Sequence, residues 1–472
     1  MRKGKLFIII LLTAIFFIKL SSAQTYHIEV QIEGIKDTSL LLGYHFGEKK
    51  YVQDTAMVDS NGKAVFEGDS LLKGGIYLII LPAKTYFEII VSENQNFGVM
   101  TNTTDLIQNI SFTNSHENTA FAEYQKYMIQ MQKKNKEITD LQKKVSNNPD
   151  STTLLQNQLK ELNEKVEQYW DNIIANNQGT FLASIIRSMK NIQMPEITIP
   201  EGTRNPDSLK WMMSYKFNKE HFFDNISFSD PKMLRTPIFE NRLNTYFDRI
   251  LIPAPDSIIP EAIKVIELSK QDKEVYQYVL SHLVNKFQTS NMMGMDGVFV
   301  ALAEKYYLSG QVWWADSKLL DKIRERVNAL KPNLIGNQCP DLNLPDPYGK
   351  EHRISENKNK VTVIYFWDPE CSHCKKTTPE LKKTWDKFKS KGLLIYAVFT
   401  QGDQPKWMEY IKKNQLDWLN VWDPKQNSNF RDLFDIYSTP VIYVLDENKK
   451  IIAKRIGIES LNSMLELLLG KE

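Results

Sequence analysis

Two cysteines, Cys371 and Cys374, stand three residues apart where a continuous apolar run gives way to a helical pattern. The run Val361–Trp367 has the length and composition of a strand that is buried on both faces. The stretch Lys375–Ser390 follows with apolar residues at helical spacing. Because a helix N-terminus stabilises negative charge, a thiol placed there forms its reactive thiolate more readily. The spacing therefore predicts a reactive dithiol at a strand-to-helix junction.

The rest of residues 331–472 continues the alternation of strands and helices. Further strands are expected over Leu393–Phe399, Val441–Leu445 and Lys450–Arg455, and further helices over Lys406–Asn414 and Ser460–Leu469. Strands that alternate with helices predict an α/β domain.

Residues 24–116 are predicted to be β-rich. Tyr26–Ile32 and Ala64–Glu67 alternate between apolar and polar residues, and Ile76–Leu81 and Tyr86–Val91 are apolar runs of strand length. Turn-forming residues such as Asn61-Gly62 separate them. Several short strands of this kind favour an all-β, sandwich-like domain.

Residues 117–330 change to a helical pattern rich in Lys, Glu, Gln and Leu. Phe121–Val145 and Thr153–Asn176, separated by a break at residues 147–150, predict a helical hairpin. Further helices are expected over Ser208–Lys219, Ile238–Ile250, Pro260–Lys286, Val298–Ser309 and Asp316–Leu330. A chain of 472 residues is too long for one hydrophobic core. The sequence therefore predicts a multidomain protein with β-rich (24–116), helical (117–330) and α/β (331–472) domains.

The first 23 residues have the order of a secretory signal peptide: basic residues, the apolar run Leu6–Ile18, then small residues before Gln24. A retained membrane anchor is the alternative, although the run is short for a membrane span. Removing this segment, with four basic and no acidic residues, changes the formal net charge from +2 to −2. A chain without a basic field is not typical of nucleic-acid-binding proteins. The expected location is the periplasm or another extracytoplasmic compartment, in solution or associated with a membrane.

Several spaced residues resemble the thioredoxin family. These are Phe366-Trp367 at the strand end, the Cys371-Ser372-His373-Cys374 motif, Pro379 inside the helix, and Thr439-Pro440 before a later strand. A proline at the last position suits a cis peptide bond that faces the dithiol. The segment from Ile335 to Leu344, with Gly349-Lys350, resembles the entry hairpin of the TlpA/ResA and AhpC/TSA branch. Residues 25–115 and 118–330 resemble the β and helical domains, of undefined function, that precede such modules in secreted Bacteroidetes-type proteins.

The resemblance implies a thioredoxin fold and a thiol–disulfide oxidoreductase that needs no cofactor. Cys371 would attack a substrate disulfide and Cys374 would resolve the mixed disulfide. His373 and Glu370 are expected to tune the thiol pKa in opposite directions. Substrate contacts are expected from three residues, which are Trp367, Thr439 and Pro440. Expected partners are proteins with thiols or disulfides, and a membrane electron donor or an oxidant protein.

Two positions depart from the family pattern. Tyr365 stands where thioredoxin has a buried Asp, and Thr377 stands where ResA-type proteins have a Glu. Both carboxylates assist proton transfer in their families, so the proton acceptor is left unassigned here.

The remaining candidate residues are interpreted as structural. Cys339 occupies a position that usually holds a small residue, and we expect it to fill the core, with a regulatory thiol as the alternative. The methionines at 292, 293 and 295 would suit soft copper, but Met near helices is typical of a core. A zinc site would need two more ligands than Cys371 and Cys374 provide, so no metal is predicted. The run of Lys, Glu and Gln over residues 125–170 is interpreted as the solvated face of a helical hairpin, with a homodimer contact as the alternative.

The function predicted from these features is extracytoplasmic thiol–disulfide exchange on protein disulfides, in the direction of reduction. His373 keeps the opposite direction open, as an oxidase or isomerase, because a His beside the thiolate favours the reduced dithiol. A third possibility is a periplasmic binding or scaffold protein with a secondary redox module, because most of the chain has no catalytic signature. A peroxidase is disfavoured, since Asp368 stands where peroxidases place a Thr.

Overall fold

The computed structural model describes residues 25–145 and 149–470. The predicted signal peptide, residues 1–23, and the first part of the predicted break, residues 147–148, lie outside the described residues. The chain divides into two compact units. One comprises residues up to 193 with the segments 222–227 and 231–242, and the other comprises 194–221, 228–230 and 243 onwards.

The first unit contains two four-stranded sheets, ordered β4-β1-β7-β8 and β3-β2-β5-β6. Side chains of both sheets, such as Ile28, Leu40 and Ile79, share one hydrophobic core, which confirms the predicted sandwich-like domain. The strands are β1 Tyr26–Glu33, β2 Thr38–Phe46, β3 Lys49–Val58, β4 Lys63–Gly68, β5 Gly75–Ile80, β6 Tyr86–Val91, β7 Asn96–Asn102 and β8 Ser111–Thr113.

Four of these strands, β2, β3, β7 and β8, were not among those predicted. β3 is an edge strand whose residues are largely exposed, so its sequence lacks the alternation that marks a half-buried strand. Its backbone pairs with β2 along almost its whole length, and this pairing defines it as a strand.

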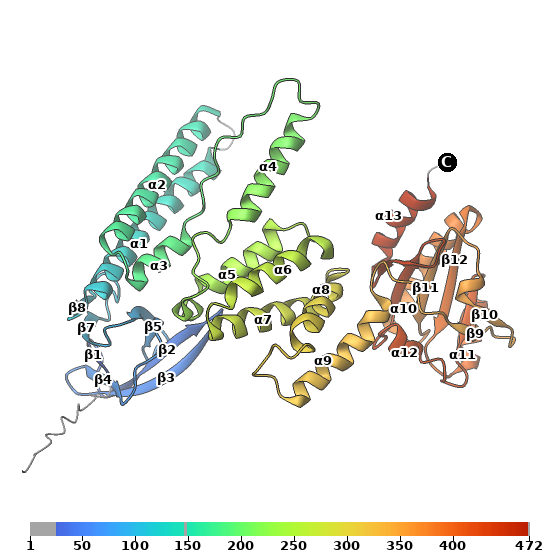
Figure 1. Ribbon diagram of the computed structural model, residues 1–472, viewed down its shortest axis with the longest axis horizontal. Helices are drawn as coiled ribbons and strands as arrows, with labels where there is room; N and C mark the ends of the chain where they lie inside the picture. The colour runs from blue at the N-terminus through green and yellow to red at the C-terminus, as the bar shows by residue number, and fades with distance from the viewer. Residues whose placement is uncertain (1–24, 146–148, 471–472) are drawn as a thin grey trace, which may run out of the picture. The chain divides into compact units, whose positions relative to one another are not determined.

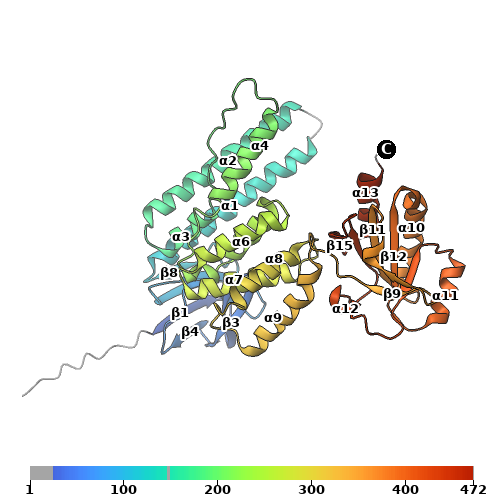
Figure 2. The ribbon, with the colours of Figure 1, turned by 45° about the vertical axis from the view of Figure 1, so that its right-hand side comes forward.

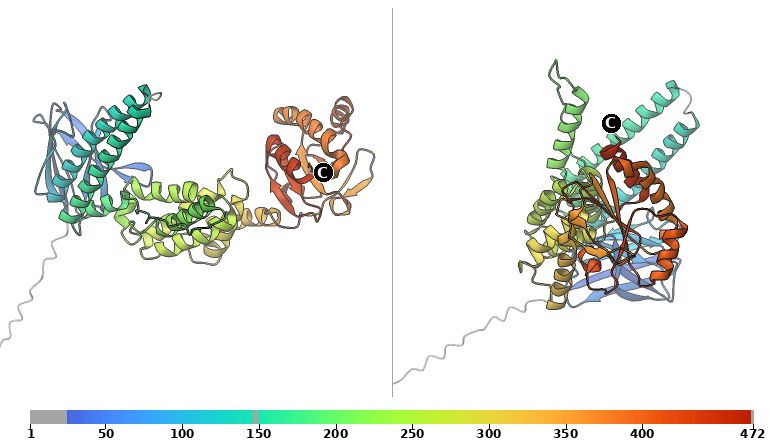
Figure 3. Two further views of the ribbon diagram at one scale, coloured as in Figure 1. Left: turned by 90° about the horizontal axis from the view of Figure 1, so that it is seen from above. Right: turned by 90° about the vertical axis from the view of Figure 1, so that its right-hand side faces the viewer.

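Two long helices, α1 (His116–Lys144) and α2 (Pro149–Asn176), form the predicted helical hairpin, and the shorter α3 is Phe181–Met189. The helices α1 and α2 run side by side in the ribbon (Figure 3). The ring of Tyr127 in α1 stacks on that of Tyr169 in α2, with ring centroids 3.8 Å apart. Ser115 caps the start of α1 by accepting a hydrogen bond from the Asn118 N–H, which satisfies a helix donor that would otherwise lack a partner.

The helical part of the second unit differs from the prediction at two places. The stretch Pro260–Lys286 is two helices and not one, because Asp272 accepts hydrogen bonds from the N–H groups of Glu274 and Val275 and so caps the start of α7. The expected core methionines divide: Met295 is buried, whereas Met292 and Met293 are exposed. The main helices are α4 Pro206–His221, α5 Ile238–Thr245 (which begins in the first unit), α6 Pro255–Ser269, α7 Lys273–Gln288, α8 Met295–Leu302 and α9 Ser317–Leu330, with π-helical turns at Tyr246–Ile250 and Ala303–Tyr307.

The C-terminal part of this unit is built on a five-stranded mixed sheet, ordered β13-β12-β11-β14-β15. β11, β12 and β13 are parallel, and β14 and β15 are antiparallel to their neighbours. Figures 1 and 2 show the sheet with its helices. The strands are β9 Asn343–Pro345, β10 Glu351–Arg353, β11 Val361–Trp367, β12 Leu393–Phe399, β13 Leu419–Trp422, β14 Val441–Leu445 and β15 Ile451–Lys454, and the helices are α10 Ser372–Phe388, α11 Gln404–Lys413, α12 Phe430–Leu433 and α13 Ile458–Leu469.

Every residue of β11 is buried, as the sequence predicted for this central strand. Alternate side chains, including Tyr365 and Trp367, point to one face, where α10, α11 and α13 supply the rest of a hydrophobic core. Ile364 and Phe366 point to the other face, toward the entry segment and α12. The sheet therefore separates two cores, and the dithiol belongs to the first. The structure confirms the predicted α/β thioredoxin fold of this region.

No helix among the described residues combines the length and the apolar character that a membrane crossing requires.

Candidate active site

The Cys371–Cys374 pair lies where β11 ends and α10 begins. A tight turn joins the two elements: the Cys371 N–H donates to the Asp368 carbonyl at 3.1 Å, and the Glu370 N–H donates to the Asp368 carboxylate at 2.8 Å. Cys371 is the N-cap residue of α10, so its thiol stands at the positive end of the helix dipole. Both cysteines are free thiols.

The two thiols have different environments. Cys371 is partly exposed, whereas Cys374, one turn along α10, is fully buried in the core. A substrate disulfide can therefore approach Cys371, whereas the Cys374 thiol is not accessible from solvent.

The loop before β14 closes over the dithiol. The Cys371 thiol donates a hydrogen bond to the carbonyl oxygen of Thr439 at 3.2 Å. The peptide bond between Thr439 and Pro440 is cis, as the sequence predicted. This loop brings residues that are far from the Cys-x-x-Cys motif in sequence into direct contact with the reactive sulfur.

The pKa values of the two thiols shift in opposite directions. Burial opposes ionisation of Cys371, but hydrogen bonds from the Thr439 side chain and from the N–H groups of Cys374 and His373 outweigh it and lower the pKa. Burial raises the pKa of Cys374 to about 11, despite hydrogen bonds that favour its thiolate. At neutral pH, Cys371 is thus the better nucleophile and Cys374 remains a protonated thiol.

The residues predicted to tune the site flank Cys371 on the surface. Glu370 and His373 are both exposed. Glu370 lies 3.9 Å from Lys375, a cation that the sequence reading did not consider. This pairing offsets part of the negative charge that Glu370 places beside the thiol.

Trp367 does not occupy the position expected of a substrate-binding residue. Its ring is fully buried and belongs to the same core as Cys374, with the Tyr365 ring stacked at 6.0 Å. The indole therefore packs inside the core next to the buried thiol. Pro379 lies inside α10, as expected.

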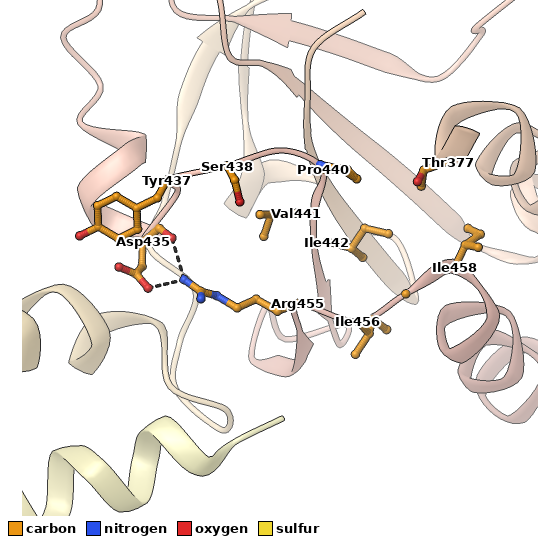
Figure 4. A pocket seen from close by; sticks show the side chains of 11 residues that line it. Thr377, Asp435, Tyr437, Ser438, Pro440, Val441, Ile442, Arg455, Ile456 and Ile458 are labelled. Atoms are coloured by element: carbon orange, nitrogen blue, oxygen red, sulfur yellow. Dashed lines mark hydrogen bonds and ion pairs between the residues drawn. The ribbon is translucent and has the colours of Figure 1, made fainter. Parts of the chain in front are cut away.

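A pocket of about 370 Å³ adjoins Pro440. Figure 4 shows Val441, Ile442 and Ile456 on its apolar side, and Asp435 with Arg455 at its polar end. The Arg455 guanidinium donates to the Asp435 carbonyl at 2.7 Å and forms an ion pair with its carboxylate. The rest of the pocket lining is formed by Thr377, Tyr437, Ser438, Gly457 and Ile458.

Sequence reasoning missed the polar end of this pocket. Asp435 is completely buried, and besides Arg455 it binds Arg326 of α9 at 2.5 Å. The sequence signal for this polar end was an acidic residue shortly before the Thr-Pro pair. Its partners could not be predicted, because they come from distant parts of the chain.

Cys339 is separated from this site by the sheet. It is buried in the second core, with Ile364 and Phe366, whereas Cys374 lies in the first. Burial raises the pKa of Cys339 to about 12. These surroundings agree with the expected role of a small core residue, because a thiol held protonated is a poor nucleophile.

Three regions of the chain match known family models. Residues 335–454 match the AhpC/TSA family. This C-terminal region is thus a thioredoxin-like domain that is similar to thiol–disulfide oxidoreductases. Upstream of this AhpC/TSA domain, residues 130–333 match a domain of unknown function, DUF5106, and residues 26–121 match another, DUF4369.

Named relatives of the AhpC/TSA domain include the thiol-disulfide oxidoreductase ResA of Bacillus cereus, which is 25% identical over 137 residues, covering 29% of this chain and 78% of ResA. Among solved structures, a domain of a possible thiol-disulfide isomerase from Cytophaga hutchinsonii is 40% identical, with a TM-score of 0.27, and covers 28% of this chain and 92% of its own. A thioredoxin-like protein from Bacteroides caccae is 18% identical, with a TM-score of 0.46, and covers 59% of this chain and 99% of its own.

Proposed function

We propose that this protein reduces disulfide bonds of other proteins outside the cytoplasm through its Cys371–Cys374 dithiol. The observation that carries the proposal is the asymmetry of the two thiols. Cys371 is accessible and has a lowered pKa, whereas Cys374 is buried and has a raised pKa. Disulfide exchange requires this arrangement, in which a nucleophilic thiol faces solvent and a resolving thiol lies behind it.

The proposed reaction has two exchange steps. The Cys371 thiolate attacks one sulfur of the substrate disulfide, a mixed disulfide forms, and the other substrate sulfur leaves as a thiolate. Cys374 then loses its proton and attacks the Cys371 sulfur. The Cys371–Cys374 bond closes, and the second substrate thiolate leaves. Two electrons pass from the dithiol to the substrate, whose thiolates take up protons from solvent.

The loop around the cis peptide would position the substrate. A peptide lying along this loop can pair its backbone with that of Thr439, as in strand addition. A side chain next to the substrate cysteine would then enter the pocket beside Pro440, between the apolar Val441 and Ile456 and the charged Arg455.

The location and partners are part of the proposal. The signal-peptide pattern of residues 1–23 supports an extracytoplasmic site of action. A reductase there needs an electron source, for which we propose a membrane-bound donor protein. The chain would act as three separate domains, formed by residues 24–116, 117–330 and 331–472. The helical hairpin, which contains residues 125–170, would carry a homodimer contact, and a partner-binding role of residues 24–330 is the scaffold alternative.

Reduction of insulin by the full chain, with dithiothreitol as electron donor, tests the activity. We expect Cys371→Ser to abolish turnover and Cys374→Ser to accumulate a mixed disulfide, whereas Cys339→Ala serves as the matched control and retains turnover. Unchanged insulin reduction by Cys371→Ser would refute the proposal.

The direction of the reaction is tested by the reduction potential of the dithiol. Trp367 lies in the core beside Cys374, so its fluorescence can follow equilibration in glutathione buffers. A value near about −270 mV or below would support a reductase. A value of about −120 to −180 mV would favour the oxidase or isomerase alternative, which rests on the presence of His373 beside the reactive cysteine.

A further inference from the structure

Cys374 must lose its proton in the second exchange step although it is fully buried. The position from which thioredoxin supplies a carboxylate holds Tyr365 in this chain. Five groups face the Cys374 thiol. They are the Asp368 backbone and Cys371 in the turn before α10, the Thr439 side chain, Tyr365 of β11 and Tyr410 of α11. Most of these groups are hydroxyls. A proton that leaves Cys374 would therefore have to pass through hydroxyl groups.

Tyr365 and Thr378 form a buried pair next to this thiol. Their hydroxyl oxygens lie 2.9 Å apart, and both residues are almost completely inaccessible. Thr378 follows Cys374 by four residues on α10, so the two side chains lie on the same buried face of the helix. Burial raises the pKa of Tyr365 far above its usual range, and hydrogen bonding to Cys374 adds to this shift.

Tyr410 is the partly exposed neighbour of this pair. It is partly exposed, packs against the same core, and has its ring 5.5 Å from that of Trp367. Burial raises the pKa of Tyr410, while a hydrogen bond with the Thr378 side chain acts in the opposite direction. Of the three hydroxyl-bearing residues near the buried thiol, Tyr410 is therefore the partly exposed one.

We propose that Tyr365, Thr378 and Tyr410 form a hydroxyl relay that carries the Cys374 proton to solvent when the mixed disulfide is resolved. This inference rests on the proposed function. The Cys374 proton passes to the Tyr365 oxygen, the Tyr365 proton passes to Thr378, the Thr378 proton passes to Tyr410, and Tyr410 gives its proton to water. The thiolate left on Cys374 attacks the Cys371 sulfur, and the substrate thiolate departs.

A hydroxyl relay leaves no charge on the relay residues themselves, because each hydroxyl donates one proton and accepts another. A buried carboxylate would instead carry a charge, and its own titration would appear in the pH profile of the resolving step. The relay predicts a resolving rate that rises with pH toward the pKa of Cys374, with no additional inflection from a buried acid.

Rapid mixing of the reduced full chain with the aromatic disulfide DTNB separates the two steps. The first thionitrobenzoate released reports attack by Cys371, and the second reports resolution by Cys374. At pH 7, Tyr365→Phe and Thr378→Val should leave the first release unchanged and slow the second by about 10-fold to 100-fold. Above the pKa of Cys374 the variants should converge with the wild type, because hydroxide then removes the proton.

Matched controls separate loss of a hydroxyl from loss of packing. Thr378→Ser keeps the hydroxyl and should retain the wild-type second release, whereas Thr378→Val keeps the shape and should not. Tyr443→Phe removes another buried hydroxyl, which donates to the Phe434 carbonyl in the second core, and should change neither step. Asp368→Asn tests the nearest carboxylate of the turn and should also leave the second release unchanged.

The relay is wrong if Tyr365→Phe and Thr378→Val both release the second product at the wild-type rate. It is also wrong if Thr378→Ser is as slow as Thr378→Val, or if Asp368→Asn alone slows the second release. Absence of the first release from wild-type protein would refute the proposed function, and the relay with it.

Discussion

The sulfur of Cys371 lies 3.2 Å from the carbonyl oxygen of Thr439, a residue 68 positions further along the chain. The two groups of Thr439 act on this thiol in opposite senses. The carbonyl accepts a hydrogen bond only from the protonated thiol, whereas the side chain stabilises the thiolate. Of the contributions that lower the pKa of Cys371 against the effect of burial, the Thr439 side chain is the largest.

Replacing Thr439 should change the reactivity of Cys371. Thr439→Val removes the hydroxyl and keeps the shape, so the pKa of Cys371 should rise and less thiolate should be present at neutral pH. We expect alkylation of Cys371 at pH 7 to slow by about threefold to tenfold. Thr439→Ser keeps the hydroxyl and should resemble the wild type. Equal alkylation rates for the Val and Ser variants would contradict this account.

Alkylation should distinguish the three cysteines. Because the pKa of Cys371 is lowered, its rate of reaction with iodoacetamide should reach a plateau at a lower pH than that of a free cysteine, whose pKa is about 8.5. Cys374, with a pKa near 11, and the buried Cys339 should react more than about 100-fold more slowly at pH 7. Mass-spectrometric peptide mapping across pH 5–9 measures each site, and early modification of Cys374 would be the contrary result.

The buried ammonium group of Lys454 should matter for stability. It donates to Asn333 at 2.8 Å and forms an ion pair with Asp296 of α8, and its side chain is almost inaccessible. Lys454→Met would leave Asp296 without its cation, and we expect a loss of about 3 kcal/mol in the free energy of unfolding. Urea denaturation followed by tryptophan fluorescence measures it.

Two further variants accompany this measurement. Lys450→Met changes an exposed lysine next to the same strand and should shift the free energy by less than about 0.5 kcal/mol. The double variant Lys454→Met/Asp296→Asn should recover part of the loss, because no buried charge is then left unpaired. No recovery would mean that Asp296 is not the partner that matters.

Cys339 should affect stability but not catalysis. Cys339→Ala removes one buried heavy atom and should cost about 1 kcal/mol. Cys339→Ser places a hydroxyl in the same apolar core and should cost about 2 kcal/mol or more. Both variants should reduce insulin at the wild-type rate, since the residue lies across the sheet from Cys374. Loss of turnover in the stable Ala variant would indicate a third redox thiol.

Local sequence determined the elements that carry the dithiol. The predominantly apolar run Val361–Trp367 favours a strand that is covered on both faces, and the helical spacing begins a few residues after it. The signals of β12 and β14 are equally local, and their predicted bounds agree with the structure. The four-residue strand β13 was not predicted.

Tertiary structure alone decided which groups surround the sulfurs. Thr439 meets Cys371 because β14 pairs with β11 in the sheet, and no pattern within either segment encodes that pairing. Tyr365 meets Thr378 because α10 packs on the face of β11 to which Tyr365 points. The sequence by itself determined where the dithiol is and what chemistry it carries. Hydrogen bonds and burial, which depend on distant segments, gave the two thiols their different environments, and the proposed roles of the thiols and the proposed relay rest on these environments.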